Sequence, residues 1–362
     1  MRQLRSKILL FNAVFILSLF FLEVFFRLAL PQEPFAFPNN LKRGRFTKEG
    51  TYQNKTMEFK ATVIVNKEGF VDSPWEDTAK PVVFLVGDSF VQAAQVNLED
   101  GWGRKLQSLF QKDAFDPQII SFGIPGAGIA TEFELIKQYA PQLKPKIIYL
   151  SFLVDNDIFN NHSQLEAKQD KPFYILQDNR LVLHWESSSH QKNILLQNFH
   201  LARWLQQNLW LKKEQKRRIT LGNGVPLNFY VHQNPPSPIW EEAWMITQKA
   251  FEDLSNYCHK NDIDLKIVLT PAHWQISRTK TQQLKSQFPQ MSNWDIENYA
   301  YQRSERMLKE LNVTTIDLYA DFRSHPDPDL LYYPIDAHWT KEGHALAAEI
   351  LYTNWKDSAS ND

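Results

Sequence analysis

The sequence has little cysteine and no excess of either sign of charge. Cys258 is the only cysteine in 362 residues, which excludes an internal disulfide and a zinc site made of several cysteines, and leaves the redox compartment open. The 40 basic and 41 acidic residues give a formal net charge of −1, so no overall field attracts nucleic acid. Since no group of His, Asp and Glu has metal-ligand spacing either, we expect no nucleic-acid partner, no metal and no cofactor.

The remaining composition is that of a folded protein. With 43% hydrophobic and 22% charged residues, the chain is long enough to bury a large core, and Cys258 is expected to pack there. The one dense group of basic residues is the run 212–218 (KKEQKRR). It fits a phosphate-binding patch or a solvated helix face, and the solvated face is the commoner use of such a run.

A long apolar run occurs only near the beginning of the chain. Three basic residues precede it, and it extends from Ile8 to Leu30. Its only charged residues are Glu23 and Arg27, which are four apart and can pair. About 20 apolar residues span a bilayer. No small-x-small cleavage site follows, which favours an uncleaved anchor over a removed signal peptide, and the basic residues before the run favour it over a buried helix. We expect residues 1–30 to anchor the chain and the rest to lie outside the cytoplasm, although basic residues at 42–48 weaken the charge contrast.

The part of the chain after the anchor is organised in two stretches. Residues 31–80 are expected to be a tether with short lead-in strands. From 81 to 358, short apolar runs alternate with amphipathic stretches, as in a parallel sheet with helices on both faces. The five runs are Val82–Val86, Gln118–Phe122, Ile147–Leu153, Leu265–Leu269 and Val313–Leu318.

A long segment, about 159–264, separates the third run from the fourth and is too long for a plain loop. It contains a predicted β-hairpin from Phe173 to Trp185 with a turn at Asp178 and Asn179. Two predicted helices follow, at 195–216 and 239–260. We interpret the segment as an insertion that caps or edges the functional site.

A serine follows the first apolar run in Gly87-Asp88-Ser89-Phe90, directly before a predicted helix over 91–110. The carboxyl ends of strands in open α/β sheets are where ligands bind, and a helix amino terminus favours an anion. Ser89 therefore has the position of a nucleophile. A helix-capping serine in a turn is the commoner reading of these residues taken alone.

Two groups of possible oxyanion donors follow the next two runs. Gly126 lies in a glycine-rich segment, 123–128, and Asn156 offers a carboxamide. Stabilising an ester oxyanion takes two or three fixed donors, which the Ser89 amide, the Gly126 amide and the Asn156 side chain could supply. A tight turn and an asparagine turn are the alternatives.

The segment 333–344 (YPIDAHWTKEGH) supplies the groups that a nucleophilic serine needs. His338 can take the serine proton, and Asp336 can fix the histidine tautomer and offset its positive charge. In an extended loop, the two side chains would fall on the same side. Taken alone, Asp336 could instead cap a helix and His338 could be an ordinary surface histidine, and both of these roles are commoner than catalysis. His273, after the fourth run, could contact substrate or simply pack.

These blocks resemble those of the SGNH (GDSL-type) hydrolases over about 82–355. The resemblance implies a flavodoxin-like three-layer αβα fold with a central five-stranded parallel sheet. It also implies Ser89 as nucleophile, Gly126 and Asn156 as oxyanion donors, and Asp336 and His338 as the remaining catalytic pair. The family usually has Asp three residues before His, where this chain has Ile335. Asp-x-His-Trp is instead similar to SGNH-like proteins that acetylate alginate and related exopolysaccharides. Two further departures are Ser121 and Val154, where the family usually has Asn and Gly.

The resulting expectation is a serine-dependent ester hydrolase acting on O-acyl groups, O-acetyl first, of an extracytoplasmic glycan or on a small acyl ester. One alternative is an O-acetyltransferase of a cell-surface or secreted polysaccharide. Another is a catalytically silent glycan-binding module, since a fold alone never guarantees chemistry.

Overall fold

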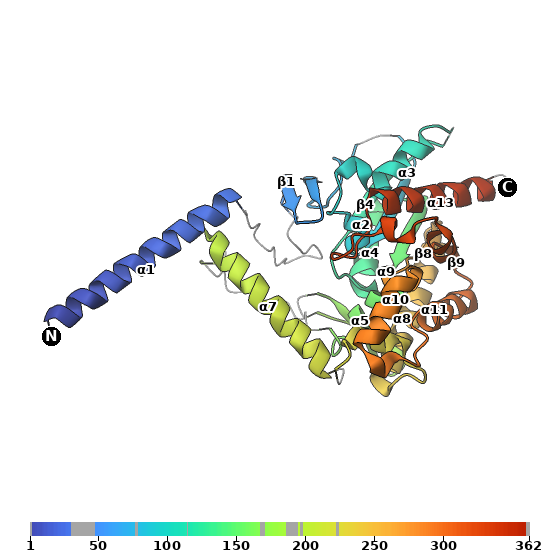
Figure 1. Cartoon of the computed structure of the whole chain (residues 1–362). Coiled ribbons are helices and arrows are strands. Elements are labelled where there is room, and N and C mark those ends of the chain that lie inside the picture. The colour runs from blue at the N-terminus through green and yellow to red at the C-terminus, as the bar shows by residue number, and fades with distance from the viewer. Residues whose placement is uncertain are drawn as a thin grey trace.

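The computed structural model describes residues 2–29, 48–76, 79–113, 115–166, 171–185, 195, 198–221 and 224–359. Its centre is a five-stranded sheet in the order β4-β3-β5-β8-β9, in which all neighbours are parallel (Figure 1). Counted along the chain, this is the order 2-1-3-4-5 of flavodoxin-like folds, so the predicted fold class is confirmed. The strands are β3 (Val82–Gly87), β4 (Gln118–Gly123), β5 (Ile147–Phe152), β8 (Asp264–Leu269) and β9 (Thr314–Asp317).

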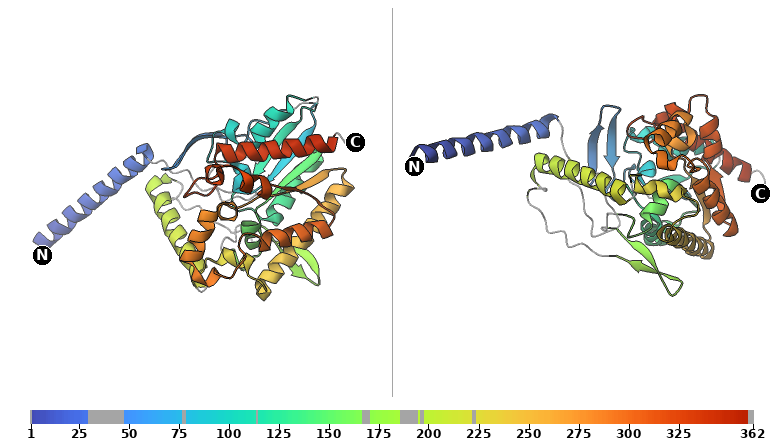
Figure 2. Two further views of the ribbon diagram at one scale, coloured as in Figure 1. Left: turned by 45° about the vertical axis from the view of Figure 1, so that its right-hand side comes forward. Right: turned by 60° about the horizontal axis from the view of Figure 1, so that its bottom comes forward.

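Apolar side chains on both faces of the sheet explain why these short runs form strands. Successive side chains of β3 point to opposite faces, and both Phe84 and Leu85 are fully buried. Phe84 packs in the cluster made with α4 (Ile129–Leu143), α8 (Pro238–Lys260) and α11 (Tyr299–Glu310). Leu85 packs in the cluster made with α3 (Trp102–Phe110), α12 (Tyr319–Ser324) and α13 (Lys341–Ala359). The molecule therefore has three layers (Figure 2).

The segment between β5 and β8 has structure of its own. Its elements are α5 (Val154–Asn160), β6 (Phe173–Gln177), β7 (Arg180–His184), α7 (His200–Leu221), η2 (Leu227–His232) and α8. The hairpin β6–β7 turns at Asp178 and Asn179, whose φ angles are both positive, as a tight hairpin turn requires. Short helices complete the region after β8: α9 (His273–Ile276), α10 (Arg278–Gln287), η3 (Pro289–Met291) and, after α12, η4 (Pro328–Leu331).

The N-terminal part consists of a long helix and a small hairpin. Helix α1 (Arg2–Ala29) projects from the domain, and its residues Gln3–Ala29 are long and apolar enough to cross a membrane (Figures 1 and 2). An antiparallel hairpin, β1 (Gly50–Lys55) with β2 (Lys60–Val65), leads into the sheet. Residues 31–47 of the predicted tether lie outside the described residues.

The continuous helix predicted over 91–110 is wrong. The chain instead forms α2 (Ser89–Gln92), η1 (Leu98–Asp100) and α3. Helix α2 ends because Ala93 takes a left-handed conformation with φ 53°. At Gly123 an added Cβ would lie 2.1 Å from the backbone nitrogen of Gln92, so α2 sits directly against the end of β4. The break lets α3 turn and pack along the sheet.

Candidate active site

Ser89 lies at the tight turn between β3 and α2. Asp88 caps this short helix, and its side chain accepts a hydrogen bond from the Phe90 amide at 2.9 Å. The turn lifts Ser89 to the carboxyl edge of the sheet, where ligands bind in this topology.

The structure brings Ser89, His338 and Asp336 together in one hydrogen-bonded row. The Ser89 Oγ lies 2.8 Å from His338 Nε2, and His338 Nδ1 lies 2.6 Å from Asp336 Oδ1. Because an ionised carboxylate only accepts, Nδ1 must carry a proton, which leaves Nε2 free to receive one from the serine. The His338 and Asp336 side chains are 25% and 27% exposed, so the row is reachable from solvent.

The loop that carries Asp336 and His338 is a compact turn, and the predicted extended loop is wrong. Ala337 has a φ of 65°, in the left-handed region that non-glycine residues seldom adopt. Its amide donates to the Tyr333 carbonyl, and the Tyr333 amide donates to the His338 carbonyl, both at 2.9 Å. These two hydrogen bonds close the turn, and the turn brings the side chains of Asp336 and His338 together. The predicted alternation of side chains along an extended strand is not what places them.

Glu58, at the tip of the β1–β2 hairpin, holds this turn. Its two carboxylate oxygens accept the amides of Ile335 and Asp336, each at 2.7 Å. Sequence reasoning missed Glu58, since a glutamate between two polar strand ends carries no signal of a distant partner. The contact makes the lead-in hairpin part of the site.

The electrostatics around Asp336 keep it ionised. Burial acts to raise the pKa of its carboxyl, but the hydrogen bond and charge of His338, with a smaller contribution from Gln95, lower it overall. An ionised Asp336 can both orient the imidazole and stabilise its cation.

Gly126 and Asn156 follow the two strands that flank β3. Gly126 lies between β4 and α4 with a φ of 63°, a conformation that favours glycine. Asn156 lies in the first turn of α5, and its Nδ2 donates to Asp88 Oδ2 at 3.1 Å. This bond ties the carboxamide to the residue before Ser89. In the sequence, Asp88 stands out only as part of the serine motif, and no sequence pattern indicates its hydrogen bond with Asn156.

Two buried carboxyl groups, Glu132 and Asp157, have raised pKa values to which the charge of Asp88 contributes. Burial raises the pKa of Glu132 to about 8, with the charge of Asp88 adding to the effect and that of Lys171 opposing it. Burial also raises the pKa of Asp157, and the same acidic neighbours reinforce the shift. These groups favour their protonated forms, and nothing in the sequence distinguishes them from surface acids on a helix.

Aromatic side chains pack against His338. The ring of Phe90 lies 4.9 Å from the His338 ring, and Trp339 packs 5.0 Å from Phe90 and 5.2 Å from Trp102. Trp339 is fully buried, so it serves the core. His273 also packs: it stacks on Tyr332 and bonds Asp329 at 2.8 Å, away from the row.

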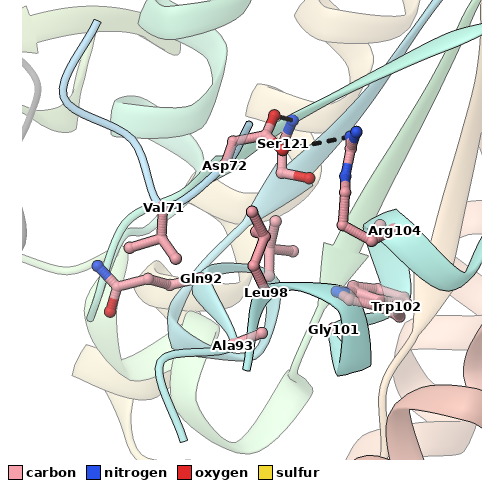
Figure 3. A pocket seen from close by; sticks show the side chains of 11 residues that line it. Val71, Asp72, Gln92, Ala93, Leu98, Gly101, Trp102, Arg104 and Ser121 are labelled. Atoms are coloured by element: carbon pink, nitrogen blue, oxygen red, sulfur yellow. Dashed lines mark hydrogen bonds and ion pairs between the residues drawn. The ribbon is translucent and has the colours of Figure 1, made fainter. Parts of the chain in front are cut away.

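A pocket beside α2 contains none of the row (Figure 3). Its polar end is closed by Asp72, which pairs with Arg104 at 3.2 Å and accepts the Ser121 amide at 2.9 Å. Since both oxygens of Asp72 already have partners within the protein, the hydrogen-bonded row at the sheet edge is the better candidate site.

Comparisons with known proteins found similar solved structures. One is an acetyl xylan esterase, with 14% identity and a TM-score of 0.41, and the match covers 75% of this chain and 98% of that one. A second is a lipase/acylhydrolase from Enterococcus faecalis, with 10% identity and a TM-score of 0.41, and the match covers 77% of this chain and 96% of that one. A third is an acetylxylan esterase from Geobacillus stearothermophilus, with 11% identity and a TM-score of 0.39, and the match covers 76% of this chain and 93% of that one. A search of curated proteins found no match.

The C-terminal part of the chain also matches a family model. Residues 236–361 match the SGNH hydrolase-like domain of the acetyltransferase AlgX, and this region contains Asp336 and His338 but not Ser89. The match and the sheet order together confirm the resemblance read from the sequence: residues 236–361 are similar to an SGNH hydrolase-like domain of the AlgX type, and the sheet has the flavodoxin-like order.

Proposed function

We propose that the chain is a serine-dependent enzyme that cleaves O-acyl esters, O-acetyl groups first, of an extracytoplasmic glycan. The observation that carries the proposal is the row from Ser89 Oγ through His338 to Asp336, with spacings of 2.8 and 2.6 Å. Ser89, His338 and Asp336 are then the nucleophile, the general base and the group that orients the base.

In the first half of the reaction, His338 Nε2 takes the Ser89 proton while Oγ bonds to the acyl carbon. The carbonyl electrons move to oxygen, where the amides of Ser89 and Gly126 and the Asn156 side chain stabilise the negative charge; losing one such donor typically costs about 10²- to 10³-fold in rate. Collapse of the intermediate breaks the bond to the glycan oxygen, which takes the proton from His338. An acyl-serine remains.

In the second half, His338 deprotonates the acceptor, which attacks the acyl carbon. Collapse expels Ser89 Oγ, and the proton on His338 returns to it. Asp336 stabilises the imidazolium in both halves, because its ionised oxygen faces Nδ1. With water as the acceptor the products are a free acid and the deacylated glycan.

An acetyl-aryl ester tests this proposal. The purified protein should release the aryl alcohol and show a transient mass increase of one acetyl group on Ser89. Ser89→Ala should abolish both, while Ser108→Ala, which changes an exposed serine on α3, should change neither. Equal turnover by Ser89→Ala would refute the nucleophile, and no turnover by the wild-type protein on any acyl ester would favour a silent binding module.

Transfer to a sugar hydroxyl is the second candidate. It is supported by the match to a family model described as an acetyltransferase and by the sequence Asp336-Ala337-His338-Trp339. An acceptor bound beside the acyl-serine gains effective concentration and can outcompete water. Mass spectrometry of oligosaccharides incubated with the enzyme and an activated acetyl donor should show added acetyl groups that are lost in Ser89→Ala. If only hydrolysis is seen across a broad panel of acceptors, the transferase candidate is rejected and the esterase candidate is retained.

A further inference from the structure

The C-terminal end of α1 caps the N-terminus of α7. Glu23 is 8% exposed, and its carboxylate accepts the backbone amides of His200 at 3.0 Å and Leu201 at 2.9 Å. Arg27 donates to Glu23 at 2.8 Å and to the Asn198 carbonyl at 2.6 Å. The first amides of a helix lack partners within it, and a carboxylate there also complements the helix dipole. The polar residues that interrupt the apolar run thus have a specific partner.

Apolar packing reinforces the cap. Phe26 is 6% exposed, and its ring lies 5.1 Å from that of Trp204 on α7. Removal of α1 as a signal peptide would delete Glu23 and Phe26 and strip both contacts from α7. The contacts therefore favour a retained α1.

Helix α7 carries a stripe of exposed residues that runs along one side. Leu205 and Leu209 are 44% and 66% exposed, and Lys212 and Lys216 are exposed further along. Their spacings of four, three and four place them on one helical face. The stripe is apolar near α1 and basic farther away, and Lys213 beside it is exposed too.

The stripe lies between the two contacts that hold α7. Trp204, next to Leu205 in the sequence, contacts α1, and Arg217, next to Lys216, donates to the Leu165 carbonyl of the domain at 2.9 Å. Neighbouring residues of a helix are about 100° apart, so both contacts flank the stripe and leave it open. Figure 1 shows α7 running from the end of α1 toward the domain.

We infer that this stripe of α7 lies on an anionic lipid surface and holds the domain beside the bilayer. The inference rests on the proposed role of α1 as an anchor, which brings the start of α7 to the membrane surface. Leucines that enter the interface and lysines that meet anionic headgroups are the features of helices that lie in this plane. The exposed lysines of the basic run 212–218 would then contact lipid headgroups at the membrane surface.

A fluorescent probe on α7 tests the inference in the full chain. Cys258 is buried, so a cysteine introduced on the surface can be labelled selectively with an environment-sensitive dye. Leu209→Cys reports on the stripe, and Thr353→Cys, exposed on α13, is the matched control. In phosphatidylcholine vesicles containing phosphatidylglycerol and a lipid-attached quencher, we expect several-fold stronger quenching at 209 than at 353, and weaker quenching by aqueous iodide.

A charge reversal and three outcomes complete the test. Lys212→Glu with Lys216→Glu should largely remove the lipid quenching at 209. Equal iodide quenching at 209 and 353 in vesicle-bound protein would overturn the inference. A blue shift at 209 without lipid quenching would also overturn it, since a protein surface would then cover the stripe. Protein that fails to float with the vesicles would overturn the anchor as well, and none of these results depends on esterase activity.

Discussion

The carboxylate of Glu58 accepts the backbone amide of Asp336 at 2.7 Å, although 278 positions separate the two residues. Its other oxygen binds the neighbouring amide of Ile335 at the same distance. The strained turn at Ala337 is therefore fixed from outside by a hairpin that belongs to neither the sheet nor its covering helices.

Replacing Glu58 should impair the chemical step. Glu58→Ala releases two amides of the turn, and because small displacements of catalytic groups can cost up to about 10²-fold, we expect kcat on an aryl ester to fall about 10- to 100-fold. Glu58→Gln, which retains one acceptor oxygen, should lie between. Glu305→Ala, at an exposed position on α11, is the control. A kcat of Glu58→Ala equal to that of the wild type would show that the turn at 333–338 keeps its conformation without Glu58.

Replacing Asp336 should be more severe. In Asp336→Asn the amide cannot fix the required imidazole tautomer or offset its positive charge, so kcat should fall by about two to four orders of magnitude. Steady-state kinetics measures this, with the exposed Asp321→Asn as the control. Activity near that of the wild type would show that another carboxylate orients His338.

Glu132 should make the protein less stable as the pH rises. Its pKa is about 8 in the folded protein against 4.5 normally, so its contribution is fully present below pH 4.5 and is lost as the pH passes through 8. Glu132→Gln should remove this loss. Above pH 8 we expect the variant to gain on the order of 1 kcal/mol or more in free energy of unfolding relative to wild type.

Urea unfolding on both sides of this pH window measures the difference. Glu305→Gln, on an exposed position, should give the same curve as the wild type at every pH. If Glu132→Gln tracks the wild type across the window, Glu132 is ionised in the folded state and the carboxyl groups near it are solvated.

Helix α1 should keep the intact chain in membranes. The apolar residues Gln3–Ala29 suffice to cross a bilayer, so a carbonate wash, which strips peripheral proteins, should leave the full-length mass in the pellet. A shortened protein in the supernatant would instead identify α1 as a cleaved signal.

The central sheet and the hydrogen-bonded row of Ser89, His338 and Asp336 could be predicted because their signals are local. Runs such as Val82–Val86 are buried on both faces, and that burial demands continuous apolar sequence. Ser89 and the pair in 333–344 stand directly beside such elements, and the required residue types are few. The three side chains do lie together in the structure.

What could not be predicted depends on long-range contacts. The break after Gln92 follows from the close approach of α2 to Gly123, which the helical pattern of 91–110 does not record. The turn at Ala337 depends on Glu58, and the place of Asn156 depends on Asp88. A hydrogen bond between distant residues leaves no periodicity, so physical reasoning on one sequence cannot find it.

The separation along the chain of Ser89 and His338, 249 positions, has a consequence for synthesis of the protein. A chain that emerges from its N-terminus exposes the proposed nucleophile, Ser89, long before its proposed base, His338. Until the last turn has closed on Glu58, Ser89 remains an ordinary alcohol with no means of losing its proton. Contacts of such long range also form late and slowly in folding. Under the proposed mechanism, a nascent or misassembled chain is therefore inactive, and activity requires that both ends of the domain have packed together.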